Sequence, residues 1–422
     1  MNADSYVYDS EHIWNFSFLQ KLLLLILIVR IFVPPIGVGS GVNLNPDDVL
    51  ILVLIPLIIL TSKKLILDKY IGLCFIIFCL ISFSTFRGYS YLSVPFHKYD
   101  IYEIIRFLKP MFLLIFINLL NPNDTLKTLD WFFEYTGWFI IFISLVEFFN
   151  PGGFGDIIEK LYAMSHHYRN LLKSDFFRRI TVTGPDPNIG GAIIALYMGY
   201  NMARYTIKKE LKIFILFIAL FASLLLTASR TIFLCVMFFI FLNLVLNRRI
   251  NIRTKFMIFF AFALVFLLLL PKFIYIVGAF ENFLLFDTSM LERYERWSDA
   301  QALFLQAPYF GWGPANAIHT NIVDGEYVFI IRKFGAIGLA SILFFMFYQA
   351  TIAFFQINKS SFDKTAPVSL VCFATLNYFS IWALTMATNN FFFNYQTMLP
   401  FIAVTGVYSR FNQLYGRRIH ET

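Results

Sequence analysis

The sequence predicts an all-helical protein that crosses a membrane many times, and two observations support this. Of its 422 residues 59% are hydrophobic and only 14% are charged, and the mean hydropathy is +0.69. Soluble domains are far more polar than this. Apolar runs of roughly 20 residues, the length that crosses a hydrocarbon core, recur from near residue 17 to near residue 411 with no soluble domain between them. The chain 1–422 is therefore predicted to be a single integral membrane domain.

The apolar runs predict about 12 transmembrane helices. The second run is short and contains Pro56, and the boundary at 227–230 leaves room only for a very tight hairpin. The predicted spans are 17–33, 49–62, 70–86, 104–120, 131–149, 189–206, 212–227, 230–247, 254–271, 334–356, 367–387 and 393–410.

The distribution of lysine and arginine predicts the orientation of these helices, because cytoplasmic connections are enriched in both. The short loops 34–48 and 388–392 contain neither residue and are predicted to lie outside. Both termini are then cytoplasmic, and two long loops, about 150–188 and 272–333, face the outer or periplasmic side. The cytoplasmic connections and ends hold Lys63, Lys64, Lys69, Lys127, Lys208, Lys209, Lys212, Arg248, Arg249, Arg253, Lys255, Lys359, Lys364, Arg410, Arg417 and Arg418.

Composition also argues against several other classes of protein. The acidic, aromatic N-terminal stretch has no basic region followed by a short apolar run, so no cleaved signal is predicted. All four cysteines fall inside apolar runs, where a thiol packs as a small hydrophobe, so neither disulfides nor a metal site is predicted. The net charge of +8 resides mainly in short connections, so topology explains it and no nucleic-acid partner is expected.

Several basic residues lie on the predicted outer side, where positive charge is disfavoured. Those at 150–188 have a simple explanation, because long loops cross a membrane regardless of charge. Arg230 does not, since it lies in a hairpin too short to escape the bias and has no acidic neighbour in sequence. An arginine at a membrane boundary indicates a functional site. The alternative is that its side chain reaches the phospholipid headgroups.

The first candidate motif is RRITVTGPDPNIGG, residues 178–191, directly before a predicted helix. Asp186 or Asn188 can cap that helix, and its free backbone amides would bind an anion. Arg178 and Arg179 lie just upstream and could hold the same phosphate. The alternative is an ordinary Pro-Asn helix start.

The second candidate is an amphipathic segment at 290–306, which is predicted to lie on the membrane surface. Its carboxylates at 292 and 299 are spaced to pair with Arg296. Arg293 is therefore favoured as the ligand-binding residue, because a guanidinium can bind phosphate oxygens in a bidentate manner. Stacking on Trp297 is its alternative. The apolar side chains that share one face are Leu291, Tyr294, Trp297 and Phe304.

The third candidate is GWGPANAIHTNIVDGEYVFIIRKFGAIG, residues 311–338. Asp324, Glu326 or His319 is the candidate general base for a reaction at the outer face. Capping of the following helix is the alternative for the two carboxylates. The adjacent pair Asp47 and Asp48 is predicted to cap the second helix rather than to bind a metal.

Together these motifs resemble the O-antigen ligase and polymerase superfamily of bacterial inner-membrane proteins. The resemblance rests on the order of the motifs and on the topology, and it covers the whole helix layout and both long loops. The motifs are SR at 229–230, R-x-x-x-W at 293–297, P-x-x-G-x-G-P at 308–314, a polar residue before Tyr327, G-x-x-G-L at 335–339, and R-x-x-x-x-G-x-x-P-N at 179–188.

The resemblance implies a glycosyltransferase C-like membrane fold and a donor glycan on undecaprenyl pyrophosphate, used at the periplasmic face without a nucleotide sugar or a required metal or cofactor. Many ligases carry a histidine in an H-N-x-Y-like sequence before this helix. Here Asp324 stands at the matching position. This departure favours a polymerase, unless His319 supplies the imidazole by another path.

The leading hypothesis is a polymerase of O-antigen or a related surface polysaccharide. The growing glycan would move from undecaprenyl pyrophosphate onto a new lipid-linked repeat unit. A ligase that transfers glycan to lipid A-core is the alternative enzyme, and a transporter of lipid-linked oligosaccharide is the alternative class. Membrane lipids and a polysaccharide chain-length regulator are the other expected partners. The expected pyrophosphate-binding residues are Arg230, Arg293, Arg179, Arg178 and Arg296, and the expected glycan-binding ones are Tyr327, Trp297 and Trp312.

Overall fold

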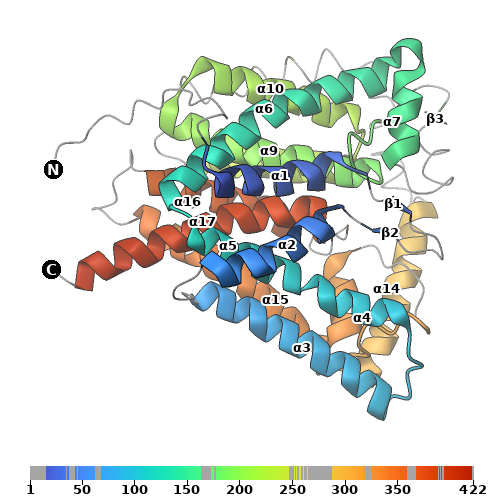
Figure 1. Ribbon diagram of the computed structural model, residues 1–422. Helices are drawn as coiled ribbons and strands as arrows, with labels where there is room; N and C mark the ends of the chain where they lie inside the picture. The colour runs from blue at the N-terminus through green and yellow to red at the C-terminus, as the bar shows by residue number, and fades with distance from the viewer. Residues whose placement is uncertain are drawn as a thin grey trace.

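The computed structural model of the chain shows long helices that run side by side, with only two pairs of two-residue strands among the described residues (Figure 1). The structure describes residues 16–34, 36–37, 43–44, 46–61, 68–162, 173–174, 177–246, 251, 253, 256–257, 260, 264, 288–318, 325–358, 367–387, 389, 391 and 394–420.

The apolar runs predicted from the sequence coincide with described helices, except that the run at 254–271 lies largely outside the described residues. In chain order the helices are α1 (Phe18–Phe32), α2 (Pro46–Thr61), α3 (Lys69–Tyr91), α4 (Lys98–Arg106), α5 (Leu108–Leu119), α6 (Pro122–Phe149), α7 (Phe154–Tyr162), α9 (Pro187–Lys208), α10 (Leu211–Leu226), α11 (Arg230–Leu246), α14 (Thr288–Gln306), α15 (Glu326–Asn358), α16 (Pro367–Thr385) and α17 (Tyr395–His420). The short 3₁₀ turn η2 (Pro151–Gly153) precedes α7, and the strand pairs are β1 (Ile36–Gly37) with β2 (Asn43–Leu44) and β3 (Lys173–Ser174) with β4 (Phe177–Arg178).

Four of the described helices, α3, α6, α15 and α16, are long and apolar enough to cross a membrane. The described residues also include two shorter apolar helices, α10 and the Thr231–Ile240 part of α11. The chain is therefore a membrane protein by the length and composition of its helices. The larger number of about 12 spans stays a prediction.

The structure corrects the predicted boundaries in three places. The predicted run 104–120 is two helices, α4 and α5, which meet at Phe107. Helix α15 begins at Glu326, before the predicted start at 334. The predicted loop at about 150–188 contains helix α7, whereas α14 coincides with the amphipathic segment predicted at 290–306 in the other long loop. Apolar runs miss these segments because their helical residues are partly charged, which hydropathy alone reads as loop.

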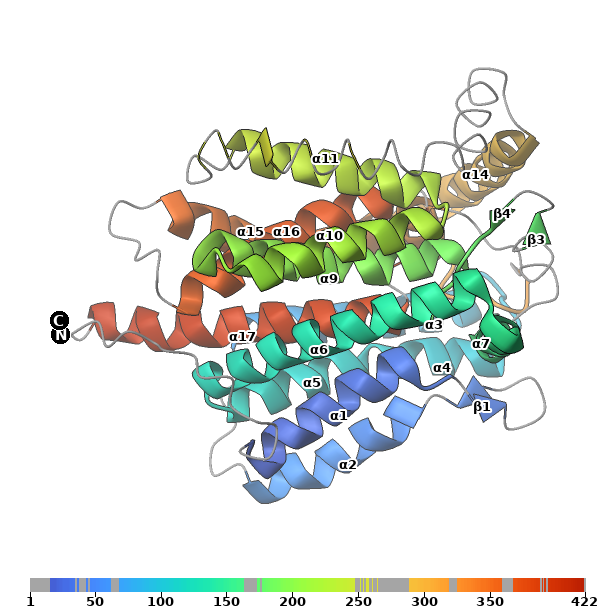
Figure 2. The same cartoon turned by 90° about the horizontal axis from the view of Figure 1, so that it is seen from above.

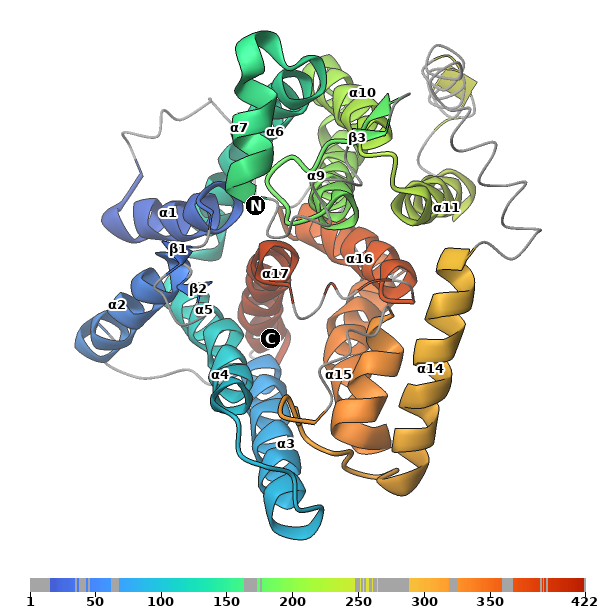
Figure 3. The same ribbon diagram turned by 90° about the vertical axis from the view of Figure 1, so that its right-hand side faces the viewer.

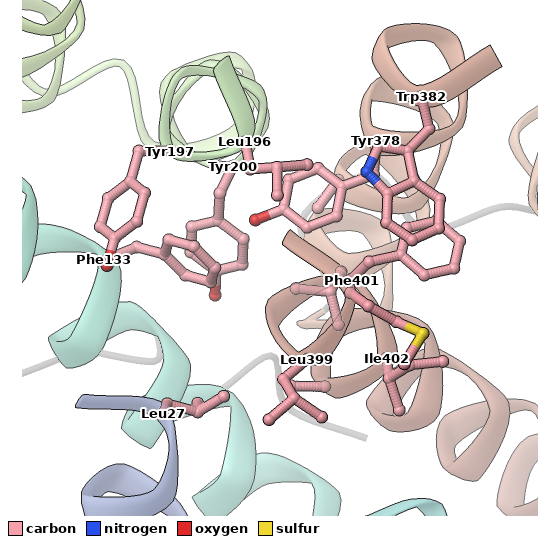
Figure 4. Packing of buried hydrophobic residues seen from close by; sticks show 14 of the residues in the cluster. Leu27, Phe133, Leu196, Tyr197, Tyr200, Tyr378, Trp382, Leu399, Phe401 and Ile402 are labelled. Atoms are coloured by element: carbon pink, nitrogen blue, oxygen red, sulfur yellow. The ribbon is translucent and has the colours of Figure 1, made fainter. Parts of the chain in front are cut away.

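Helix α17 lies at the centre of the bundle when it is viewed along its length, next to α5, α9 and α16 (Figure 3). Stacked aromatic rings fill the space between the central helices (Figure 4). Phe133 of α6 stacks on Tyr200 of α9 at 4.1 Å between ring centroids, and Trp382 of α16 stacks on Phe401 of α17 at 4.2 Å. Such buried pairs stabilise a core beyond the burial of their area. Helices α1 and α2 form one edge of the bundle and α11 the other (Figure 2).

The two ends of the bundle differ in what they carry. The beginning of α1 and the end of α17 lie at one end, on the left in Figure 1. The opposite end, here called the loop end, carries α7, α14, the start of α9, the turn between α10 and α11, residues 308–318 and the start of α15. Both α7 and α14 lie across the direction of the long helices there (Figures 1 and 3). The loop end therefore gathers the segments in which the sequence predicts chemistry.

Candidate functional site

The segment before α9 is held rigidly by a buried carboxylate. Glu147, near the end of α6, is 1% exposed and accepts hydrogen bonds from the backbone N–H of Thr181 (2.8 Å), the Thr181 hydroxyl (3.0 Å) and the backbone N–H of Val182 (2.8 Å). Val182 has a φ of +58°, in the left-handed region that a β-branched residue rarely adopts. Local strain of this kind persists only where the surroundings hold the backbone firmly. The three bonds to Glu147 supply that restraint.

The same segment contacts the turn between α10 and α11. Arg179 Nε donates to the Thr227 carbonyl at 3.2 Å, and its Nη2 donates to the Ala228 carbonyl at 3.4 Å. These carbonyls follow the end of α10, where a cation is favoured by the helix dipole. Ser229 Oγ donates to Asn188 Oδ1 at 2.7 Å, which ties the turn to the first turn of α9. Arg179 and the Ser229-Arg230 motif, distant in sequence, are thus neighbours in the fold.

Arg230 is the first residue of α11, so its backbone is placed at this turn, while its side chain lies outside what the structure describes. Ala228, two residues before it, has a φ of +49°. That left-handed residue reverses the chain within three residues, as the tight hairpin in the sequence predicts. The turn places the start of α11 at the loop end.

The first backbone N–H groups of α9 donate their hydrogen bonds within the protein. Of the two predicted capping residues, Asp186 is the N-cap, and its Oδ1 accepts from the backbone N–H of Asn188 (2.8 Å) and of Ile189 (3.1 Å). The N–H of Gly190 donates to the Asp186 carbonyl at 3.0 Å. A Cβ at position 190 would collide with the Thr181 carbonyl, so glycine is required by close packing here. The amides that the sequence analysis assigned to an anion therefore have Asp186 as their partner.

Arg178 has carboxylate partners of its own. Its Nη2 lies 2.9 Å from Asp156 Oδ1 and 3.2 Å from Glu159 Oε2, both on α7. The guanidinium thereby links β4 to α7, and its charge is balanced within the protein. Its predicted role in binding pyrophosphate stays a prediction.

Two predicted glycine motifs form one structural unit. Helix α15 is broken at Gly335, whose φ of +67° and ψ of −170° are accessible almost only to glycine. After the break, the N–H groups of Ala336 and Ile337 donate to the carbonyls of Pro308 (2.8 Å) and Tyr309 (3.1 Å). Before it, the Lys333 carbonyl accepts from the Gly313 N–H at 2.8 Å. The segment 308–313 thus supplies the hydrogen bonds that the broken helix lacks.

This unit is fastened to α3. The Ser84 hydroxyl lies within hydrogen-bonding distance of the Phe310 and Lys333 carbonyls, and Arg87 Nη1 donates to the Gly311 carbonyl at 3.0 Å. A Cβ at Gly88 would collide with the Trp312 carbonyl. Helix α3 therefore fixes the segment 308–313 against the break in α15.

A cluster of charged side chains lies beside this break, and the sequence analysis did not identify it. Lys333 is 4% exposed, and its Nζ lies 2.7 and 3.0 Å from the two carboxylate oxygens of Glu103 on α4. The Asn316 amide donates to Glu103 (3.1 Å) and to Asp100 (2.7 Å), and the Tyr89 hydroxyl donates to Asp100 at 2.9 Å. Asp100 and Glu103 are three residues apart in KYDIYEIIR, a spacing that places both carboxylates on one face of a helix. This spacing is the feature of the sequence that could have indicated the cluster. The predicted span begins at residue 104, so it left Asp100 and Glu103 outside any predicted helix.

The start of α15 is anchored by the candidate base Glu326 and by Tyr327. Glu326 is fully buried, its N–H donates to the Met386 carbonyl at 2.7 Å, and its Oε2 accepts from the Phe391 N–H at 2.8 Å. The Tyr327 hydroxyl donates to the Ala383 carbonyl at 2.6 Å. These bonds join α15 to the end of α16 and the segment after it, so both residues have structural partners.

The predicted tryptophans are placed at the same end. Trp297 of α14 lies against Gly325, where a Cβ would sit 3.4 Å from the indole Nε1. Trp312 Nε1 donates to the Leu303 carbonyl at 2.9 Å, which ties the segment 308–313 to α14. Arg296 is half-buried in the same helix.

Three further predicted residues lie wholly or partly outside the described residues. His319 and Asp324 lie outside the described residues, and so does the side chain of Arg293, whose backbone belongs to α14. Their predicted roles stay predictions. Among the described residues, no group of three or more His, Cys, Asp or Glu side chains could hold a metal ion.

Asp47 and Asp48 do not cap the second helix, as the sequence analysis predicted they would. Both follow Pro46, the first residue of α2, so neither is its N-cap residue. Asp47 pairs with Arg30 of α1 at 3.0 Å and with Lys109 of α5 at 3.3 Å, and Lys109 also contacts Asp48. The pair instead joins α1, α2 and α5 through ionic contacts.

Comparison with known proteins supports the resemblance noted from the motifs. A search of curated proteins finds no match to the chain. A family model described as O-antigen ligase matches residues 215–343, a stretch that includes most of α10, all of α11 and α14, the segment 308–313 and the broken start of α15. The matched stretch is less than half of the chain, and it agrees with the resemblance to the O-antigen polymerase and ligase superfamily.

Proposed function

We propose that this protein is a membrane glycosyltransferase that polymerises a surface polysaccharide. The growing glycan, linked through its reducing end to undecaprenyl pyrophosphate, is transferred to a hydroxyl of a new lipid-linked repeat unit on the periplasmic face. The superfamily match supports transfer of a glycan. The polymerase reaction rests on the sequence DGEY at 324–327, where many ligases have an H-N-x-Y-like sequence.

The observation that carries the proposal is the meeting of two basic motifs at the loop end. Arg179 donates to the carbonyls of Thr227 and Ala228, directly before Ser229 and Arg230. Segments from separate parts of the sequence thereby bring two arginines to one turn, on the side where the lysine and arginine distribution disfavours positive charge. A pyrophosphate leaving group is an anion of the kind that guanidinium groups bind in a bidentate manner.

In the proposed reaction the acceptor hydroxyl oxygen attacks the anomeric carbon of the donor glycan, and the bond from that carbon to the pyrophosphate oxygen breaks. Asp324, Glu326 or His319 takes the hydroxyl proton. Arg230 and Arg293, together with Arg179, stabilise the negative charge on the departing pyrophosphate. The attack inverts the anomeric carbon, by analogy with the superfamily.

Purified protein in vesicles supplied with lipid-linked repeat units tests the proposal. A ladder of longer glycans on the undecaprenyl carrier is the expected product. Transfer of sugar to added lipid A-core would instead identify a ligase. Movement of the lipid-linked unit across the bilayer without a new glycosidic bond would identify a transporter.

Single substitutions of Arg230 and Arg293 by alanine test the assigned roles. Each is expected to lower the rate of chain extension by about 10²-fold or more, the usual effect of removing a group that stabilises developing charge. The control is Lys212→Ala, because the Lys212 side chain is 58% exposed. Lys212 lies at the start of α10, at the opposite end of that helix from the turn at 227–230. Extension should be measured with equal amounts of folded protein. Long chains made at the normal rate by both arginine variants would rule out the assignment.

A further inference from the structure

Helix α7 has an unusual distribution of polar and apolar side chains. It follows α6 after a sharp reversal, in which Asn150 adopts a left-handed conformation and Gly152 has a φ of +58°. A Cβ at Gly155 would lie 2.7 Å from the Glu147 carbonyl, so α7 starts in close contact with the end of α6. The reversal sends α7 across the direction of α6 rather than back along it (Figures 1 and 3).

The polar side of α7 faces the protein. Glu159 is 4% exposed, and together with Asp156 it holds Arg178. The Tyr162 hydroxyl donates to the Phe32 carbonyl at the end of α1. Burial raises the pKa of this Tyr162 hydroxyl, so it keeps its proton for that bond. These contacts leave the opposite side of the helix turned outward.

The outward side of α7 is apolar. Phe154 is 61% exposed, Ile157 52% and Leu161 54%, and the spacings of three and four place them on one face. A helix of a soluble protein has the reverse arrangement, with its apolar stripe toward the core. Among the described residues, nothing thus accounts for this face.

The exposed face of the neighbouring helix α6 indicates what lies against the apolar face of α7. Helix α6 is long and apolar enough to span a membrane, and its exposed Phe142 (60%) and Phe149 (69%) lead directly to the turn before α7. A helix that lies across a spanning helix at its end lies in the plane of the membrane surface. The apolar face of α7 therefore continues the lipid-facing surface of α6 at the level where the hydrocarbon meets the headgroups.

We propose that α7 is a membrane-surface helix whose outward face, Phe154, Ile157 and Leu161, inserts among the phospholipid acyl chains of the leaflet at the loop end. Lys160, exposed at the border of that face, reaches the headgroup phosphates. Through Arg178 the inserted helix fixes the depth of β4, and so of the neighbouring Arg179, relative to the lipid surface. The lipid contact does not depend on the proposed reaction.

The test measures lipid contact directly. Single cysteines replace Ile157, Leu161 or Lys160 in a chain whose exposed Cys79 is changed to serine, and each carries a bimane fluorophore. The protein is reconstituted in phosphatidylcholine and phosphatidylglycerol vesicles with bromine near the carbonyl end of the acyl chains. Labels at 157 and 161 are expected to lose most of their emission to the bromine and little to aqueous iodide. The label at 160 is the control, and iodide is expected to quench it more.

A second pair of variants tests whether these side chains hold the helix at the membrane. The double substitution of Ile157 and Leu161 by aspartate is expected to remove bromolipid quenching of a label at position 154. Lys160→Asp leaves the apolar face intact and is expected to retain that quenching. Labels at 157 and 161 that are quenched by iodide and not by bromolipid would show that water covers this face. Labels protected from both quenchers would show that protein covers it, and either result overturns the proposal.

Discussion

Single buried side chains determine how the segment before α9 is held, and Glu147 is the clearest case. Replacement by alanine removes the acceptor of three hydrogen bonds and leaves donors of Thr181 and Val182 buried without it. Each unsatisfied buried donor costs about 1–3 kcal/mol. We expect Glu147→Ala to lower the thermal unfolding temperature in detergent clearly. Glu147→Gln retains one acceptor oxygen and is expected to lose less, and equal losses in the two variants would contradict this explanation.

Gly335 offers a second test at the scale of one residue. In Gly335→Ala, the added methyl group collides with Tyr309, and its backbone angles cost about 1–3 kcal/mol in any residue with a Cβ. We expect a large loss of folded protein, measured by size-exclusion chromatography of a fluorescent fusion. Gly72 of α3 is the matched control, because a Cβ there meets nothing within 4 Å. Gly72→Ala should be neutral or slightly stabilising.

Polar contacts join pairs of helices at the loop end. Of all the features of the fold, these contacts between elements are the ones that the sequence predicts least well. The spacing of glycines within 308–314 and 335–339 was visible, but a linear pattern does not show that one segment completes the hydrogen bonds of the other. The contact between Arg179 and the turn at 227–230 was expected only as part of a shared site. Local periodicity determines where helices form, whereas such contacts depend on how the whole bundle packs.

The ion pair between α4 and α15 can be tested with a double-mutant cycle. Removing one partner of a buried pair costs about 3–5 kcal/mol, whereas replacing both by neutral residues often costs little. We expect Lys333→Met to destabilise the protein, because it leaves the Glu103 carboxylate without its cation. Glu103→Gln keeps an acceptor for Asn316 but leaves the Lys333 ammonium unpaired.

The combined variant, Glu103→Gln with Lys333→Met, is expected to unfold closer to the wild-type temperature than either single variant. Thermal unfolding in detergent measures all four proteins. Losses that simply add in the double variant would show that the two side chains act independently.

At the scale of the whole molecule, hydropathy predicted the helical class and the positions of most described helices. It did not predict α7, because FGDIIEKLY is short and contains three charged residues. It also placed Asp100 and Glu103 outside the helix that they belong to, since charge marks the edge of an apolar run. The sequence offers three candidates for the general base, Asp324, Glu326 and His319. Residue type alone does not select among them, because it does not say where a side chain lies relative to the acceptor hydroxyl.

The predicted orientation of the chain has a direct test. The beginning of α1 and the end of α17 lie at the same end of the bundle, opposite the loop end (Figure 1). We expect a green fluorescent protein fused after Thr422 to fluoresce, as it does when it folds in the cytoplasm. Alkaline phosphatase inserted between residues 163 and 172 should be active, as it is only outside. The reversed pattern of activity would place the loop end in the cytoplasm and exclude a periplasmic reaction.

The break in α15 also has a consequence for biosynthesis. The carbonyls that receive the N–H groups of Ala336 and Ile337 belong to Pro308 and Tyr309, which leave the ribosome before α15 does. The serine and glycine of α3 that hold this segment are made earlier still. Each partner is therefore already present when the next one is translated. A circularly permuted chain that starts within α15 would reverse this order, and it would have to insert an incomplete helix first.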